Sequence, residues 1–181
     1  MIYGLILAGG KGSRLYPLSR AKEPKQFLKI LNDKSLLLNT IDRVSNLVAK
    51  ERIYIVTNKD YEKKIKEEID EEMKKNIFIE PQNKETATCI GLSAIKLLKA
   101  DANAVMVVLP SDHYIYGEKE YLDTLKQAVD IANKRRGVVT LGIEPKRPET
   151  GYGYIKYNKD NKEGESFSVE KFVEKPDLDT A

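Results

Sequence analysis

The stretch that decides the fold stands at the start of the chain, where residues 2–14 read IYGLILAGGKGSR. Ile2–Ala8 is an apolar run too short for a helix, and we expect it to be a buried strand. The glycines that follow, Gly9, Gly10 and Gly12, allow positive φ angles and a close approach of the backbone to a ligand. Successive backbone N–H groups in such a loop can bind a phosphate. Because ligands of open α/β sheets bind at the carboxyl ends of the strands, the sequence predicts a phosphate loop here.

Short apolar runs and amphipathic stretches alternate along the rest of the chain. The expected strands are Ile2–Ala8, Arg52–Thr57, Ile77–Glu80, Ala104–Leu109 and Gly137–Ile143. The expected helices cover about Leu36–Val48, Tyr61–Lys75, Thr86–Leu98 and Glu118–Lys134. Nearly continuous apolar strands indicate burial on both faces, as in a parallel sheet. The sequence therefore predicts an α/β fold, Rossmann-like and layered, with a mostly parallel sheet and helices on both faces. After Pro148, GYGYIKYN and SFSVEKFVEKP alternate like strands and predict a β-rich C-terminal extension.

Length and composition limit the classes of protein to which the chain can belong. Its 181 residues predict a single domain over residues 1–181. With 31 basic and 28 acidic residues the formal net charge is +3, so neither nucleic acid nor an anionic membrane is expected as a partner. Cys89 is the only cysteine, which excludes an internal disulfide and favours a reducing, cytoplasmic compartment. The sequence stops at DLDTA, just after an expected strand, so we expect the chain to be truncated at its C-terminus.

Two better-known phosphate loops do not match this sequence. A Walker A loop requires Gly-Lys-Ser/Thr after a fixed spacer, but here Lys11 is followed by Gly12. The dinucleotide fingerprint requires a third glycine where Leu15 stands. For the glycines alone, an ordinary tight turn is the alternative interpretation. Arg14, whose guanidinium can bind phosphate oxygens through a fork of donors, favours phosphate binding over a plain turn.

Five blocks of sequence, taken in order, carry a resemblance to a known family. They are LAGGKGSRLYPLSR with EPKQFL (Leu7–Arg20 and Glu23–Leu28), IFIEPQNKETATCI (Ile77–Ile90), VLPSDH (Val108–His113), TLGIEPKRPETGYGYI (Thr140–Ile155) and FVEKP (Phe172–Pro176). Together they resemble the N-terminal part of the mannose-1-phosphate guanylyltransferases, also called GDP-mannose pyrophosphorylases, within the nucleotide-diphospho-sugar transferase family. The resemblance covers essentially the whole chain.

That resemblance implies an enzyme that converts GTP and mannose 1-phosphate into GDP-mannose and pyrophosphate, with Mg²⁺ as cofactor. The alternatives are a sugar-1-phosphate nucleotidyltransferase for another base or sugar, and a non-catalytic nucleotide-sugar-binding fragment. A glycosyltransferase would carry a D-x-D metal motif, which Ser111-Asp112-His113 is not. The oligomeric state stays open, with a homodimer as one alternative.

The resemblance also implies catalytic roles for Arg14, Lys25 and Asp112. Arg14 and Lys25 are expected to clamp the triphosphate, since positioning and charge neutralisation supply most of the catalysis of phosphoryl transfer. Asp112 follows the expected strand Ala104–Leu109, and a carboxylate at the carboxyl end of a strand can hold Mg²⁺. The second metal aspartate of the family is absent from this chain. For His113, the only histidine, a titrating base is one interpretation, but a structural or supporting role is favoured because the attacking phosphate is already ionised.

The binding residues are expected in two groups. Where the family has Asn-Thr-Ala-Pro, this sequence reads Glu85-Thr86-Ala87-Thr88, so only the threonine is carried over from that run. The carboxylate of the FVEKP block can accept hydrogen bonds from sugar hydroxyls, and its lysine can meet the sugar phosphate. The expected nucleotide-binding residues are Ala8, Gly9, Gly10, Gly12, Ser13, Pro81 and Thr86. The expected sugar-phosphate-binding residues are Glu149, Gly151, Glu174 and Lys175.

Overall fold

The structure is a computed structural model that describes residues 1–10, 12, 15–20, 23–80, 86–163 and 166–181. The chain divides into two compact units, Met1–Lys126 and Gln127–Ala181, and each is described by itself. The single nucleotidyltransferase domain expected over residues 1–181 stays a prediction.

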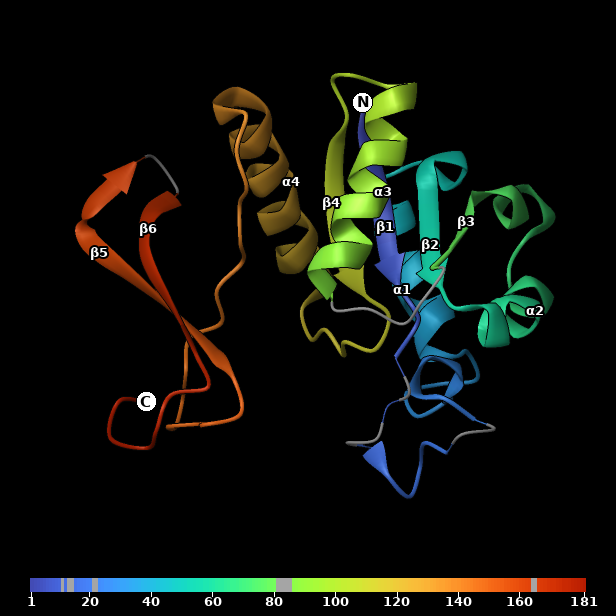
Figure 1. The fold of residues 1–181 in the computed structure, drawn as a ribbon, viewed down its shortest axis with the longest axis horizontal. Helices are drawn as coiled ribbons and strands as arrows, with labels where there is room; N and C mark the ends of the chain where they lie inside the picture. The colour runs from blue at the N-terminus through green and yellow to red at the C-terminus, as the bar shows by residue number, and fades with distance from the viewer. Residues whose placement is uncertain (11, 13–14, 21–22, 81–85, 164–165) are drawn as a thin grey trace. The chain divides into compact units, whose positions relative to one another are not determined.

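A four-stranded parallel sheet forms the centre of the first unit (Figure 1). β1 lies in the interior of the sheet, where Leu5 is registered with Tyr54 on one side and with Val108 on the other. Leu5 has no exposed surface, as expected for a strand that is covered on both faces. In spatial order the strands are β3 (Ile77–Ile79), β2 (Ile53–Thr57), β1 (Ile2–Leu7) and β4 (Val105–Pro110).

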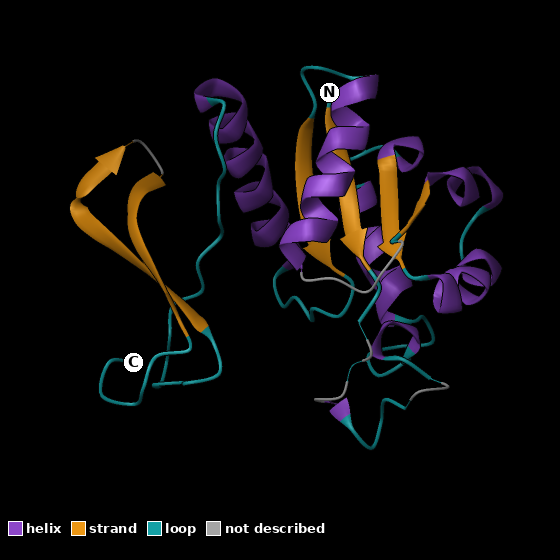
Figure 2. Cartoon of the chain, viewed as in Figure 1, coloured by secondary structure: helices purple, strands orange, loops and turns teal. Residues whose placement is uncertain are grey.

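Helices cover both faces of this sheet (Figures 1 and 2). On one face, Cys89 of α3 (Thr86–Ala100) packs in a buried cluster with Leu5 and Val56. On the other face, Val44 of α1 (Leu36–Ser45) lies 3.7 Å from the point where a Cβ on Gly4 would stand. The α-helices of the described residues are α1 (Leu36–Ser45), α2 (Lys59–Glu68), α3 (Thr86–Ala100) and α4 (Glu118–Arg135). The 3-10 turns are η2 (Lys25–Phe27), η3 (Lys50–Arg52) and η4 (Glu71–Asn76). The predicted α/β fold with a mostly parallel sheet is confirmed.

The expected helix Tyr61–Lys75 is wrong in its second half. α2 ends at Glu68, and the backbone is extended at Ile69 and Asp70 before η4 begins. An α-helix rises about 1.5 Å per residue and would have carried the chain straight on. Instead, η4 brings Asn76 to the start of β2, where its side-chain amide donates to the carbonyls of Glu51 (3.0 Å) and Ile53 (3.2 Å). Because the helix ends at Glu68, the chain can turn through η4 and place β3 beside β2.

The expected strand Gly137–Ile143 is also wrong, because residues 137–143 form no regular element. Val138 is 98% exposed and Ile143 is 89% exposed. The apolar pattern of this segment said nothing about a partner, and a strand exists only where a neighbour pairs its N–H and C=O groups. α4 ends at Arg135, and the positive φ of Arg136 turns the chain out of the helix.

The second unit contains an antiparallel hairpin of β5 (Gly153–Glu163) and β6 (Ser166–Glu174), which confirms the predicted β-rich extension. The register of the hairpin shifts after Lys156, where the ladder is irregular. The rings of Tyr157 and Phe167 pack across the two strands with centroids 4.8 Å apart. None of the helices in the described part of the chain combines the length and the apolar character needed to cross a membrane.

We expect Ile55→Ala to reduce the free energy of unfolding by about 2–5 kcal/mol, because the substitution leaves a cavity in the sheet core. Ile55 has no exposed surface. The matched control is Ile143→Ala, which makes the same chemical change at a side chain that is 89% exposed, so its effect should stay within about 0.5 kcal/mol. Urea denaturation followed by circular dichroism measures both. Equal losses in the two variants would contradict the placement of the core.

Candidate functional site at the ends of β1 and β4

The direction of strand order changes between β1 and β4. From β1 the chain proceeds to β2 and β3 on one side, whereas β4 pairs with the other side of β1. In open α/β sheets, such a switch point opens a crevice beyond the carboxyl ends of the strands, and ligands bind there. Leu7 and Pro110 are registered with each other at the ends of β1 and β4. The glycine loop, which follows β1, and Asp112, which follows β4, therefore both lie next to the switch point.

The first residue of the glycine loop is held by two buried side chains. The Ala8 carbonyl accepts hydrogen bonds from Nε2 of Gln26 (3.0 Å) and from Oγ1 of Thr57 (3.0 Å), and neither side chain is exposed. The next carbonyl, that of Gly9, accepts from Nδ2 of Asn58 (3.2 Å). Asn58 also caps α2 by accepting from the backbone N–H of Tyr61 (3.2 Å). The loop therefore starts from a fixed position between the end of β2 and η2.

Lys25 and Asp112, which lie 87 residues apart in the sequence, form an ion pair at this place. Nζ of Lys25 is 2.6 Å from Oδ2 of Asp112, and the two side chains are 26% and 23% exposed. The side chain of Lys25 extends past the glycine loop: a Cβ on Gly10 would lie 3.4 Å from Cε of Lys25, and a Cβ on Gly12 would lie 2.6 Å from its Cβ. Glycine at these positions leaves room for the lysine, so the structure brings together four of the predicted residues.

Glu80 is a further carboxylate beside the loop, at the end of β3. Its Oε2 lies 3.4 Å from the point where a Cβ on Gly9 would stand, and its backbone N–H donates to the Thr57 carbonyl (2.8 Å). Burial and the neighbouring Glu80 carboxylate raise the pKa of the Cys89 thiol to about 12. Cys89 therefore stays protonated near neutral pH and acts as a packing residue of α3, not as a nucleophile.

The other predicted residues of the first unit are either outside the described residues or exposed. Arg14, Ser13 and Pro81 lie outside the described residues. Thr86 is the first residue of α3, and its side chain is exposed. The side chain of His113 is exposed too, while its backbone carbonyl accepts a hydrogen bond from Arg43 (3.3 Å).

The predicted sugar-phosphate residues gather at one end of the hairpin in the second unit. Glu174 is registered with Gly153, and its Oε2 lies 2.7 Å from the point where a Cβ on that glycine would stand. Oε1 of Glu149 accepts from the backbone N–H of Gly151 (3.3 Å). Nζ of Lys175 is 3.3 Å from Oε1 of Glu174, and both side chains are more than half exposed. An exposed ammonium and two carboxylates can bind a phosphorylated polyol.

The residues that could hold a cation are few. Within the part of the chain that the structure describes, no three His, Cys, Asp or Glu side chains form a metal cage. Asp112 offers one partly exposed carboxylate at the switch point. Mg²⁺ commonly binds through one or two carboxylates together with waters and substrate phosphates. Asp112 therefore fits an Mg²⁺ ion that is shared with a nucleotide.

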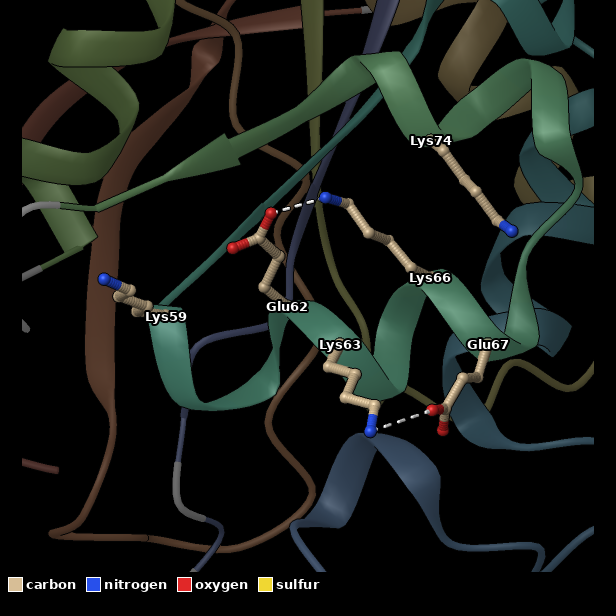
Figure 3. Close-up of a pocket in the computed structure, with 6 residues that line it drawn as sticks. All are labelled: Lys59, Glu62, Lys63, Lys66, Glu67 and Lys74. Atoms are coloured by element: carbon tan, nitrogen blue, oxygen red, sulfur yellow. Dashed lines mark hydrogen bonds and ion pairs between the residues drawn. The ribbon is translucent and has the colours of Figure 1, made fainter.

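A shallow hollow of about 460 Å³ lies away from these residues, on the charged face of α2 and η4 (Figure 3). Lys66 pairs with Glu62 (2.5 Å) and Lys63 with Glu67 (3.9 Å), each at helical i,i+4 spacing. Exposed pairs of this kind are common on solvated helix faces and contribute less than about 1 kcal/mol. None of the predicted site residues lines the hollow, so the candidate site remains at the ends of β1 and β4.

Sequence analysis missed the residues that support this site. Gln26 stands in the quoted EPKQFL block, but its contact with Ala8 joins separate elements and has no local signal. Thr57 is the last residue of the expected strand Arg52–Thr57, and Asn58 follows it directly. Polar side chains at the carboxyl end of a parallel strand are a usable signal, because those ends meet at one edge of the sheet.

The parallel sheet and its switch point define an α/β protein of the doubly wound type, with charged residues gathered where such sheets bind ligands. Residues 3–181 match the family described as nucleotidyl transferase. The chain belongs to the nucleotidyl transferase family, which confirms the resemblance inferred from the five sequence blocks.

Individual relatives agree with this assignment. The chain is 41% identical over 188 residues to a mannose-1-phosphate guanylyltransferase of Salmonella montevideo, with 100% of this chain and 39% of the relative covered. A crystal structure described as mannose-1-phosphate geranyltransferase from Thermus thermophilus has a TM-score of 0.88 and 36% identity, covering 99% of this chain and 51% of that one. A structure described as mannose-6-phosphate isomerase from Helicobacter pylori has a TM-score of 0.76 and 32% identity, covering 99% and 62%. The chain thus spans well under half the length of the curated relative.

We expect Gly12→Ala to destabilise the fold by at least about 1–2 kcal/mol, because an L-residue is strained at positive φ. Gly12 has φ 74°, and the added methyl group would lie 2.6 Å from Cβ of Lys25. The matched control is Gly91→Ala in α3, where nothing lies within 4 Å and the change should stabilise the helix by about 0.5–1 kcal/mol. Urea unfolding of both variants gives the comparison. A neutral Gly12→Ala would show that Lys25 does not lie against the loop.

Proposed function

We propose that the protein to which this chain belongs transfers GMP from GTP to mannose 1-phosphate, giving GDP-mannose and pyrophosphate. The Lys25–Asp112 pair is the observation that carries the proposal, because it places an ammonium group and a carboxylate beside a glycine loop at the switch point of the sheet. The name of the Salmonella relative supports the choice of GTP and mannose 1-phosphate. Related reactions with another base or sugar remain the runner-up.

The reaction needs positioned charge more than it needs a reactive side chain. An oxygen of the sugar phosphate attacks the α-phosphorus of GTP, the bond from that phosphorus to the bridging oxygen breaks, and pyrophosphate leaves with the bonding electrons. The attacking phosphate is already ionised, so neither a protein base nor a covalent nucleophile is required. Groups that bind the developing charge lower the barrier instead. The exposed His113 and the protonated Cys89 have no part in this scheme.

The residues of the first unit divide this work. Backbone N–H groups of the loop at Gly9, Gly10 and Gly12 approach the phosphates, and the ammonium of Lys25 neutralises charge on the leaving pyrophosphate. Arg14 is proposed as a second clamp. The Lys25–Asp112 pair is only part-buried, so the negative charges of a triphosphate can reach Lys25 and compete with Asp112 for it.

Asp112 is proposed as the residue that binds Mg²⁺. When bound, Mg²⁺ supplies positive charge that offsets the repulsion between the phosphates and the nucleophile. An aspartate whose lysine partner has turned to the triphosphate presents a free carboxylate for this ion. Thr86 and Pro81 are proposed to contact the nucleotide near the start of α3.

The hairpin end of the second unit is proposed to bind mannose 1-phosphate. The carboxylates of Glu149 and Glu174 can accept hydrogen bonds from sugar hydroxyls, and the backbone at Gly151 leaves room for the sugar. The ammonium of Lys175 can pair with the phosphate. A cytoplasmic location and a homodimer stay predictions made from the sequence.

We expect Asp112→Asn in the full-length protein to lower kcat for pyrophosphate release by about 100-fold and to remove most of its dependence on Mg²⁺ concentration. The matched control is Asp123→Asn in α4, a half-exposed carboxylate that also pairs with a lysine, and its kinetics should be those of the wild type. The assay supplies mannose 1-phosphate and Mg²⁺ with GTP, ATP, UTP or dTTP in turn. A wild-type enzyme without preference for GTP would reject the guanine assignment, and unchanged kinetics in Asp112→Asn would reject the metal role.

We expect Lys175→Ala to raise KM for mannose 1-phosphate by about 10-fold or more, because a charge-assisted hydrogen bond contributes about 1.5–3 kcal/mol. KM for GTP should not change, since the loss concerns one substrate. The control is Lys171→Ala, which removes an exposed lysine of β6, the strand that ends just before Lys175. Initial rates at varied sugar phosphate and fixed GTP measure the effect. The assignment of Lys175 fails if both variants have the same KM.

A further inference from the structure

The backbone around Asp112 is held at two points. On the preceding side, the backbone N–H of Ser111 donates to the Leu7 carbonyl (3.2 Å), which extends the contact of β4 with β1. On the following side, the His113 carbonyl accepts a hydrogen bond from Nη2 of Arg43 (3.3 Å). Asp112 stands between these two contacts, so its carboxylate depends on both the sheet and α1.

Arg43 is an unusual residue to find in this position. It is only 8% exposed, and burying a charged group is costly unless it is well paired. Within the described residues no carboxylate forms an ion pair with Arg43. It contacts the Thr40 hydroxyl (3.2 Å), the His113 carbonyl and the face of the Tyr121 ring, whose centroid lies 5.8 Å from Cζ. A guanidinium can make each of these contacts, but none of them is with a negatively charged group. Packing alone therefore does not explain why a charged residue is buried here.

Thr40, one turn before Arg43 on α1, gives this contact its direction. Its hydroxyl donates to the Leu36 carbonyl (3.0 Å), while the Ser111 carbonyl lies at 3.5 Å. A hydroxyl has one hydrogen, so the shorter bond takes it, and the oxygen stays free to accept from Arg43. The hydroxyl thereby orients the guanidinium. Of the two contacts that α1 makes with the Ser111–His113 segment, the one from Arg43 (3.3 Å) is shorter than the one from Thr40 (3.5 Å).

We propose that Arg43 is a positioning residue for the reaction: from α1 it holds the His113 carbonyl and so keeps the Asp112 carboxylate opposite Lys25. The inference rests on the function proposed above, because that function requires the Asp112 carboxylate to be positioned accurately. Misplacing a catalytic group by about 1 Å can cost about 100-fold in rate. Arg43 itself touches no substrate in this scheme.

The test uses Arg43→Met in the full-length protein, which keeps an unbranched apolar chain and removes the donors. The matched control is Arg52→Met, the same chemical change at a partly buried arginine next to the opposite, amino end of β2. We expect Arg43→Met to lower kcat by about 10- to 100-fold and to raise the Mg²⁺ concentration at half-maximal rate, with KM for mannose 1-phosphate unchanged. Arg52→Met should keep wild-type kinetics. Arg43→Lys, which retains one charged donor, should recover part of the rate.

A second measurement does not depend on activity. Hydrogen–deuterium exchange of the peptide covering residues 111–116 should be about 10-fold faster in Arg43→Met than in Arg52→Met or the wild type. Equal exchange in the two variants, or a rate loss of the same size in both, overturns the proposal. If the wild type releases no pyrophosphate from GTP, the proposed function is wrong, and the exchange comparison still decides whether Arg43 holds the segment.

Discussion

The Ala8 carbonyl is the point on which the geometry of the site depends. β1 ends just before it, and two side chains with no exposed surface, Gln26 and Thr57, donate to its oxygen. Gln26 directly follows Lys25, so the same bond fixes where the lysine enters the crevice. Thr57 is followed by Asn58, which binds the Gly9 carbonyl and caps α2. A single buried acceptor thus joins the loop, η2 and the end of β2, because leaving it unpaired would cost about 1–3 kcal/mol.

The charged residues of the site contribute little to stability. Lys25 and Asp112 form a part-buried ion pair, in which the cost of removing two charges from water offsets much of their attraction. Their positions follow from buried, uncharged contacts: Gln26 beside the lysine, and the Leu7 carbonyl before the aspartate. This division suits a site for highly charged substrates. Buried hydrogen bonds position the loop, while the pair itself is exposed enough for a triphosphate and a cation to reach it.

Local patterns predicted the elements well where the signal was local. The strand that became β1, the glycines after it and the long helix α4 were expected within a few residues, because apolar spacing records which face is buried. The same patterns failed where the outcome depended on distant partners. Residues 137–143 are apolar but find no strand beside them, and the helix after Lys59 breaks because Asn76 reaches the start of β2. For the site, the blocks of sequence indicated Lys25 and Asp112, but not that Gln26, Thr57 and Arg43 hold them in place.

In the proposed function, Lys25 and Asp112 separate at the ends of β1 and β4, so that Lys25 binds a nucleoside triphosphate and Asp112 binds its metal ion. A crystal structure of the full-length protein with GTP and Mn²⁺ tests it most directly, since Mn²⁺ can be located by its anomalous signal. The account predicts an anomalous peak beside the Asp112 carboxylate, with the triphosphate along the glycine loop and within hydrogen-bond distance of Nζ of Lys25. A triphosphate bound elsewhere, or a Lys25–Asp112 pair still closed at 2.6 Å beside bound nucleotide, would contradict it.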